Sequence, residues 1–123
     1  MRQARVFFAA QGQPDEISGA DVVVVAENDG DKWADLIRDR APNAVVVVVG
    51  SPQAICEATL FPRARIIGVA DSAQADAVVD AVVNDLDKEI EVVARCEGER
   101  GIDGKFAPVP VRIGARGILE IVD

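Results

Sequence analysis

The side chains that could act in catalysis are few, because the chain contains no histidine and no tyrosine. Histidine is the side chain whose unperturbed pKa lies near neutral pH. Proton transfer would therefore depend on an aspartate, glutamate, cysteine or lysine with a perturbed pKa. Cys56 and Cys96 lack the Cys-x-x-Cys spacing of a zinc or redox site, and no histidine is present to complete a metal site. We expect two buried free thiols, a reducing compartment and no metal.

Two polar positions at predicted helix starts could bind an anion or cap the helix. Ser51 precedes Pro52, and proline is common as the first residue of a helix. Free backbone amides and the helix dipole favour an anion at such a terminus, whereas serine and aspartate are also frequent N-caps. We interpret Ser51 as an N-cap, with an anion site as the alternative. Asp71 and Ser72 are interpreted as capping residues of the next helix.

The charge balance excludes two classes of partner. The chain has 21 acidic and 13 basic residues and a net charge of -8, which repels phosphate backbones and acidic membranes. We expect no nucleic-acid or membrane partner, and we expect Arg63 and Arg65 to be paired with carboxylates rather than with a phosphate. The apolar run 44–49 is far shorter than the roughly 20 residues of a membrane span. Residues 1–3 begin no signal sequence, so a cytoplasmic location is expected.

Valine-rich runs alternate with helical patterns in the first two thirds of the chain. Continuous apolar runs are typical of parallel strands that are covered on both faces. Apolar residues with helical spacing predict a helix that Asp31 caps and that buries Trp33, a second helix from Ser51 to about Leu60, and a third that begins at Ser72 and includes Leu86. The predicted parallel strands are Arg5–Ala9, Asp21–Ala26, Ala44–Val49 and Arg65–Val69.

The last third of the chain has the period of antiparallel strands. Residues 89–97 alternate between apolar and charged side chains, which predicts a strand with one solvent-exposed face. Glycines interrupt the chain after this run, and residues 106–113 and 118–122 supply two more strands joined by a turn. Pro108 and Pro110 cannot donate to a neighbouring strand, so we expect this strand at a sheet edge or these positions facing outward.

Two blocks of sequence resemble the lactate/malate dehydrogenase family, especially its malate-type members. The first block is "ADVVVVAEND" followed by "APNAVVVVVGSPQAICEATLFPRARIIGVADSAQADA". In the family a valine-rich strand, a helix, a second strand ending in "TNP", "G-F-P-x-x-R-V-I-G" and "L-D-x-x-R" follow in this order. The second block is "EGERGIDGKFAPVPVRIGARGILEIV", which is similar to the family's closing "EGEYG" and "GVPV" segments.

The resemblance implies a shortened α/β fold. We expect a half Rossmann-like parallel sheet of about four strands with helices, then a helix and C-terminal antiparallel strands. The whole chain, 1–123, is expected to form a single domain: 1–70 would be the partial Rossmann-like half, and 71–123 would resemble part of the family's C-terminal domain. In the 3-2-1-4-5-6 strand order, loss of strands 2 and 3 leaves a contiguous half-sheet. Its first strand, "RVFFAA", corresponds to the family's first or third strand, and its bared edge must be covered or paired.

The parts of the family that bind a dinucleotide are largely absent. Members open with a strand, a G-x-G-x-x-G turn for the pyrophosphate and an acidic residue for the ribose. In "ARVFFAAQGQPDE" only Gly12 remains of these glycines, and the next strand follows without the ribose acid. Gly12, Asn28 and Ser51 are the candidate cofactor contacts. No cofactor is expected, and NAD is implied by the family resemblance alone.

The substrate-site motifs are also changed. Ser51 stands where the resemblance places the Asn of "TNP", and Gln74 stands where it places the Arg that pairs with the substrate carboxylate. Asp71 keeps its position, as a remnant of the motif or as a plain helix cap. An arginine fork makes charge-assisted hydrogen bonds to a carboxylate, whereas a glutamine amide carries no charge. With the histidine region missing, no catalytic residue is assigned.

These losses predict a catalytically inactive lactate/malate dehydrogenase-like protein that acts as a binding or assembly module. Two alternatives stay open: an NAD-dependent oxidoreductase of malate or lactate type, and a sensor for a small anion or nucleotide. The bared strand edge predicts a homo-oligomer, most simply a dimer, or burial of this edge under the C-terminal strands.

Overall fold

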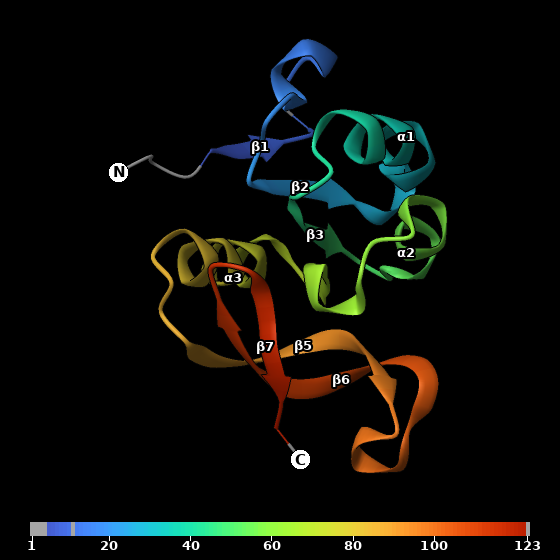
Figure 1. Cartoon of the computed structure of the whole chain (residues 1–123), viewed down its shortest axis with the longest axis vertical. Coiled ribbons are helices and arrows are strands. Elements are labelled where there is room, and N and C mark those ends of the chain that lie inside the picture. Colours follow the sequence, from blue (N-terminus) through green and yellow to red (C-terminus); the bar gives the residue numbers. More distant parts are fainter. Residues whose placement is uncertain (1–4, 11, 123) are drawn as a thin grey trace.

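The computed structural model describes residues 5–10 and 12–122, without the side chains of Pro14 and Asp31 (Figure 1). Within these residues, seven strands form one sheet in which each strand neighbours the next in sequence. Strands β1 to β4 pair in parallel, and β4 to β7 pair antiparallel. The expected fold class is confirmed. The strands are β1 (Val6–Phe8), β2 (Val22–Ala26), β3 (Val45–Val49), β4 (Ile66–Val69), β5 (Lys88–Glu97), β6 (Asp103–Gly114) and β7 (Gly117–Ile121).

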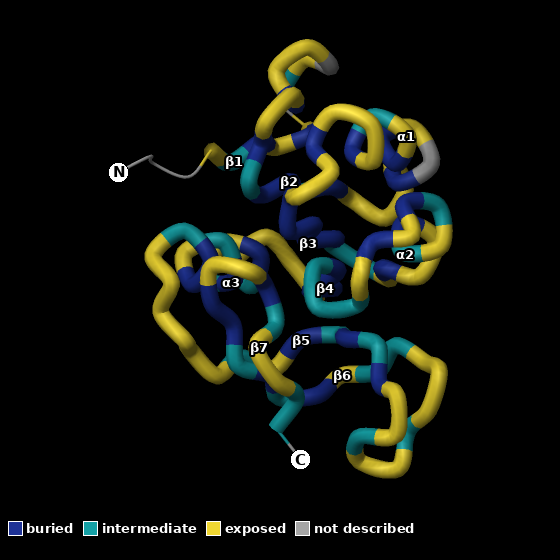
Figure 2. The backbone as a smooth tube through the Cα atoms, in the orientation of Figure 1, coloured by how far each residue is buried: buried dark blue, intermediate teal, exposed yellow. Residues whose placement is uncertain are grey.

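Both faces of β2, β3 and β4 are largely buried, which explains their continuous apolar sequence, whereas β1 buries only Phe7 (Figure 2). Successive side chains of a strand point to opposite faces. One core cluster therefore takes alternate residues of β2 and β3, and a second cluster takes the residues between them. The first includes Val23, Val25, Val46 and Val48, and the second includes Val22, Val45 and Val47.

Helices cover the two faces unequally (Figure 1). Residues of α1 (Gly30–Arg40) and α2 (Gln53–Thr59) belong to the first core cluster, and residues of α3 (Ser72–Val83) belong to the second. Trp33 of α1 is buried against Phe7 of β1, with ring centroids 5.3 Å apart in an edge arrangement. Such a pair contributes about 0.5–1.5 kcal/mol beyond its buried area. The predicted core position of Trp33 is confirmed.

The starts of the first two helices differ from the prediction. The N-cap of α1 is Asp29, so Asp31 lies within the helix instead of capping it. The N-cap of α2 is Pro52, and no described side chain caps this helix. The prediction of Ser51 as N-cap is therefore wrong. The local sequence is compatible with Ser51 as the N-cap. In the structure, however, the backbone amide of Ser51 forms a hydrogen bond with a side chain at the end of another strand, as described below.

The start of α3 follows the prediction more closely. Asp71 is the N-cap and its carboxylate accepts a hydrogen bond from the backbone amide of Gln74 at 2.9 Å. Ser72 is the first helical residue and not itself the cap. The helix ends at Val83, so Leu86 lies beyond it with an exposed fraction of 45%. The apolar spacing that includes Leu86 continues past the point where the backbone leaves the helix.

The prolines of β6 lie on the part of the strand that β7 does not reach. Pro108 and Pro110 face Val93 and Glu91 of β5, whereas the pairing of β6 with β7 starts at Val111. Beyond Val111, β6 is internal to the sheet. Pro108 thus lies at an edge, and Pro110 takes part in the pairing only through its carbonyl oxygen, which accepts a hydrogen bond from the amide of Val122 and needs no donor from the proline.

The two edges of the sheet are β1 and β7. Since β7 lies at the opposite edge, the C-terminal strands do not bury β1, and that alternative is wrong. β1 lies beside β2, which is the place of the first strand in a 3-2-1-4-5-6 order if β2 corresponds to the fourth. Backbone bonds join residues 5 and 9 to β2, so the amides of Val6 and Phe8 point away from the sheet.

Cys56 and Cys96 are free, as predicted. Cys96 is buried, but Cys56 is only half-buried, which corrects the expectation for that residue. Burial raises the pKa of both thiols. Among the described helices, none is long and apolar enough to span a membrane.

Candidate functional site

The predicted site residues follow the carboxyl ends of the parallel strands. Gly12 comes after β1, Asn28 after β2, Ser51 after β3, and Asp71 after β4. Parallel strands end at one edge of a sheet, and ligands of open α/β sheets bind along this edge. The predicted site residues therefore lie at one edge of the sheet, and their role there remains a prediction.

Gly12 is held by a turn that closes on β1. Its amide donates a hydrogen bond to the carbonyl oxygen of Phe8 at 2.9 Å. A Cβ atom at Gly12 would lie 2.4 Å from Cε1 of Phe7, so a larger residue would displace the ring. This close approach gives a structural reason for glycine here. Asn28 lies in the short helix η2 (Glu27–Asp29) and is exposed.

The amide of Ser51 is occupied by a carboxylate of the chain itself. Ser51 N–H donates a hydrogen bond to Oε1 of Glu27, which directly follows β2. Gly50 has a φ of +121°, and a Cβ there would lie 2.6 Å from the Glu27 side chain. The glycine thus lets the Glu27 carboxylate reach the position that an external anion would need. Glu27 was not among the predicted site residues, although its place directly after a parallel strand is a signal for this edge.

Asp71 and Gln74 form a hydrogen-bonded unit at the start of α3. Besides the bond from the Gln74 amide to Asp71, Oε1 of Gln74 accepts a hydrogen bond from the backbone amide of Ala70 at 2.7 Å. Nε2 of Gln74 donates to the carbonyl oxygen of Glu91 in β5. The side-chain amide therefore fastens the helix start to the antiparallel part of the sheet.

An open hollow of about 400 Å³ lies at the same edge. Seven of its nine lining residues are apolar. The walls include Phe8, Val24 and Val49 from the ends of β1, β2 and β3. The first two turns of α3 contribute its polar residues, Ser72 and Asp76. None of these described lining residues is positively charged, so the hollow has no group that would balance a pyrophosphate.

Arg63 and Arg65, the predicted ion-pair residues, lie in the short helix η3 (Arg63–Arg65). Arg63 binds the carboxylate of Glu99 with two hydrogen bonds of 3.0 and 2.9 Å, which confirms its pairing. The Arg63 guanidinium lowers the pKa of Glu99 from 4.5 to about 2. Arg65 stacks on the ring of Phe61 at 4.3 Å and donates to backbone carbonyls. Within the described residues it has no carboxylate partner, so the prediction for Arg65 is wrong.

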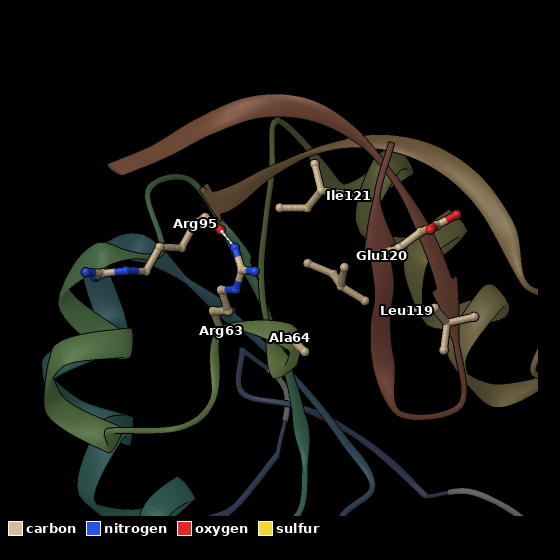
Figure 3. A pocket seen from close by; sticks show the side chains of 7 residues that line it. Arg63, Ala64, Arg95, Leu119, Glu120 and Ile121 are labelled. Carbon is tan, nitrogen blue, oxygen red and sulfur yellow. Dashed lines mark hydrogen bonds between the residues drawn. The ribbon is translucent and has the colours of Figure 1, made fainter. Parts of the chain in front are cut away.

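A smaller hollow of about 130 Å³ lies between Arg63 and β7 (Figure 3). Figure 3 shows Arg63 directed toward the backbone of Arg95, to whose carbonyl oxygen it donates at 3.0 Å. The Arg95 side chain extends away from Ile121. With its donors held by Glu99 and Arg95, the Arg63 guanidinium is part of the scaffold.

The structure thus joins Asp71 to Gln74 and brings Ser72 and Asp76 to the ends of β1, β2 and β3. It links Ser51 to Glu27, which is not a predicted site residue, and among the described residues Ser51 has no hydrogen bond to a predicted one. Within the described residues, no group of three metal-ligating side chains is close enough to hold a metal ion. The assignments of Gly12, Asn28 and Ser51 as cofactor contacts remain predictions.

Comparison with known proteins finds a partial sequence match. No protein-family model matches the chain. A malate dehydrogenase from Salinibacter ruber is 35% identical over 54 residues, which are 44% of this chain. The match spans only 17% of that protein's length.

Comparison with solved structures finds the fold over nearly the whole chain. The malate dehydrogenase of Aeropyrum pernix has a TM-score of 0.81 at 16% identity, covering 92% of this chain and 71% of that one. A lactate dehydrogenase of Cryptosporidium parvum, solved with lactic acid and nicotinamide adenine dinucleotide, has a TM-score of 0.81 at 14% identity, with coverages of 92% and 71%. The chain therefore has the fold of the lactate/malate dehydrogenases and, over part of its length, a sequence similar to theirs.

Proposed function

We propose that this chain is a lactate/malate dehydrogenase-like protein that does not transfer hydride and that acts as a binding or assembly module. One observation carries the proposal. At the position where the resemblance places the substrate-binding arginine, Gln74 uses both atoms of its amide group to hold α3. Turning Gln74 toward a substrate would break hydrogen bonds that each contribute about 0.5–1.5 kcal/mol.

The chemistry of the remaining groups supports the same proposal. A 2-hydroxy or 2-oxo acid needs a cation for its carboxylate and a group that exchanges a proton near neutral pH. The hollow at the carboxyl edge offers no cation among its described lining residues. The chain has no histidine. Loss of a general acid or base lowers a rate by about 10² to 10⁴.

The features that would bind a dinucleotide are also largely missing. A pyrophosphate is normally held by backbone amides of a glycine-rich turn at a helix N-terminus. Here the turn after β1 closes on Phe8 and leads into η1 (Pro14–Ile17), which is a single short turn. After β3, the backbone amide of Ser51 donates a hydrogen bond to the carboxylate of Glu27 and is therefore not free for a ligand. Negative charge at this point opposes a bound phosphate.

The test is a titration of the purified chain with NADH, followed by nicotinamide fluorescence, together with assays of malate and lactate oxidation. We expect no saturable change in fluorescence and no turnover. Turnover by protein free of contaminating enzyme contradicts the proposal and supports the oxidoreductase alternative. The anion-sensor alternative predicts a raised melting temperature with dicarboxylates or nucleotides, and a larger rise in Glu27→Gln, where the competing charge is removed.

The assembly part of the proposal rests on the sheet edge. β1 pairs with β2 on one side only, and Phe8 on this strand has an exposed fraction of 39%. Edge strands with free backbone amides pair readily with another strand. We propose a homodimer that joins two β1 strands, in a cytoplasmic protein whose single sheet makes one domain. A monomer in sedimentation equilibrium would contradict the dimer and leave the proposed loss of activity untouched.

A further inference from the structure

We propose that the hollow between β1, β2, β3 and α3 binds a small primary amine with an apolar body. This inference deepens the proposed function, since it assumes that the carboxyl edge no longer serves an anionic cofactor. The hollow has a volume of about 400 Å³, which falls within the range of roughly 300–1,000 Å³ typical of small-molecule sites. Such sites combine apolar walls with a few placed polar groups.

The apolar part of the hollow exists because no helix fully covers this end of the sheet. Val24 and Val49 line the hollow from the side of the sheet that α3 covers, and they remain only partly buried. Phe8 adds a half-exposed aromatic ring to the same wall. A ligand of modest size would remove these side chains from water, at about 25 cal/mol for each Å² of apolar surface.

The polar part of the hollow selects the charge of the ligand. Ser72 and Asp76 lie four residues apart on α3 and therefore on the same side of the helix. The Asp76 carboxylate is exposed and forms no hydrogen bond or ion pair with the residues that the structure describes. A primary ammonium has three donors, which match a carboxylate and a hydroxyl together.

The start of α3 carries a partial positive charge of about half a unit, which favours an anion. The carboxylates of Asp71, the N-cap of this helix, and of Asp76 outweigh it, so the surroundings favour a cation. No arginine or lysine lies among the described lining residues, and the chain as a whole carries a net charge of -8. A field of this sign concentrates cations near the surface and repels carboxylates and phosphates. The hollow is therefore opposite in charge preference to a site for a 2-oxo acid or a dinucleotide.

The probe for this site is 2-phenylethylammonium, added to ¹⁵N-labelled full chain and followed by amide chemical shifts. We expect saturable shifts at Ser72, Ala75, Asp76 and Val24. Two matched probes separate the contributions: 3-phenylpropionate keeps the ring but reverses the charge, and ethylammonium keeps the charge but lacks the ring. Both should bind more weakly than 2-phenylethylammonium.

Asp76→Asn should weaken binding of 2-phenylethylammonium by about threefold to fivefold, the effect of one partly exposed ion pair. Asp80→Asn removes the same charge one helical turn further along α3, outside the hollow, and should leave binding nearly unchanged. Equal weakening in the two variants, equal binding of 3-phenylpropionate, or no saturable shift up to the solubility limit would each overturn the inference. NADH added to a separate sample reports on the proposed loss of activity independently.

Discussion

Gln74 and Glu91 join the two parts of the sheet: the side-chain Nε2 of Gln74, at the start of α3, donates a hydrogen bond to the main-chain carbonyl oxygen of Glu91 in β5. The parallel strands end before α3, and the antiparallel strands begin after it. A single amide side chain thus connects the capped helix start to the strand that continues the sheet. A group in this position stabilises the fold and is not available to a ligand.

Replacement of Gln74 by alanine should therefore reduce stability. Two side-chain hydrogen bonds are lost, so the free energy of unfolding should fall by about 1–3 kcal/mol. Urea unfolding followed by circular dichroism measures this change. Gln53→Ala is the control, because the only side-chain hydrogen bond of Gln53 to a described residue is an exposed one to Glu57 in its own helix. This variant should change stability by less than about 0.5 kcal/mol. Equal effects in the two variants would contradict the structural role of Gln74.

The pair of Glu99 and Arg63 predicts a pH dependence of stability. The pKa of Glu99 is about 2 in the folded chain, against an ordinary value of 4.5, because Arg63 stabilises the ionised carboxylate. A carboxyl group with a lowered folded pKa stabilises the fold fully above its unfolded pKa and loses this effect as the pH falls. The stability difference between wild type and Glu99→Gln should be constant above about pH 5, should shrink as the pH falls to about 2 and should vanish only below that pH.

Urea unfolding of both proteins across this pH range checks the prediction. Glu91→Gln is a matched control, since the side chain of Glu91 faces Pro110 across the strand pair and forms no hydrogen bond with a described side chain. The stability difference between wild type and Glu91→Gln should not show the pH dependence expected for Glu99→Gln. A stability difference between wild type and Glu99→Gln that grows as the pH falls would contradict the prediction.

Gly117, at the start of β7, should tolerate no side chain. Its φ is +96°, and a Cβ atom there would lie 2.2 Å from the carbonyl oxygen of Ala64. Gly117→Ala must move the β6–β7 turn away from η3, so we expect a loss of about 3–5 kcal/mol in the free energy of unfolding. Gly104→Ala is the control: its φ is +71° but its surroundings are open, so only the backbone strain of about 1–2 kcal/mol is expected. Thermal and urea unfolding that rank the two variants equally would contradict the close approach.

The two sheet edges allow a direct test of the dimer. Phe8 on β1 and Leu119 on β7 are both exposed apolar residues, with exposed fractions of 39% and 49%. A lysine on an edge strand opposes pairing with another chain. Phe8→Lys should shift the sedimentation equilibrium to monomer, and Leu119→Lys should leave the dimer intact. A dimer lost through Leu119→Lys alone would place the interface on the opposite edge.

Much of the fold could be predicted from local sequence. Runs such as residues 45–49 are apolar throughout because both faces of a parallel strand are buried, and alternation in residues 88–97 marks a strand with one exposed face. Asp71 was predicted as a cap because capping depends on residues three positions apart. The predictions for Ser51, Asp31 and Arg65 were wrong, since their partners come from other elements or the helix starts elsewhere.

The amino-acid sequence alone is enough to predict the order and type of the elements, the absence of histidine and the resemblance to the lactate/malate dehydrogenases. These follow from residue types and from spacings within a few positions. The folded chain was needed to show that Glu27 accepts a hydrogen bond from the amide of Ser51, that Gln74 is bound to Glu91, and that Phe8 and Asp76 line the same hollow. Contacts of this kind join segments far apart in the chain, and they depend on strand register and helix placement, which no local pattern specifies.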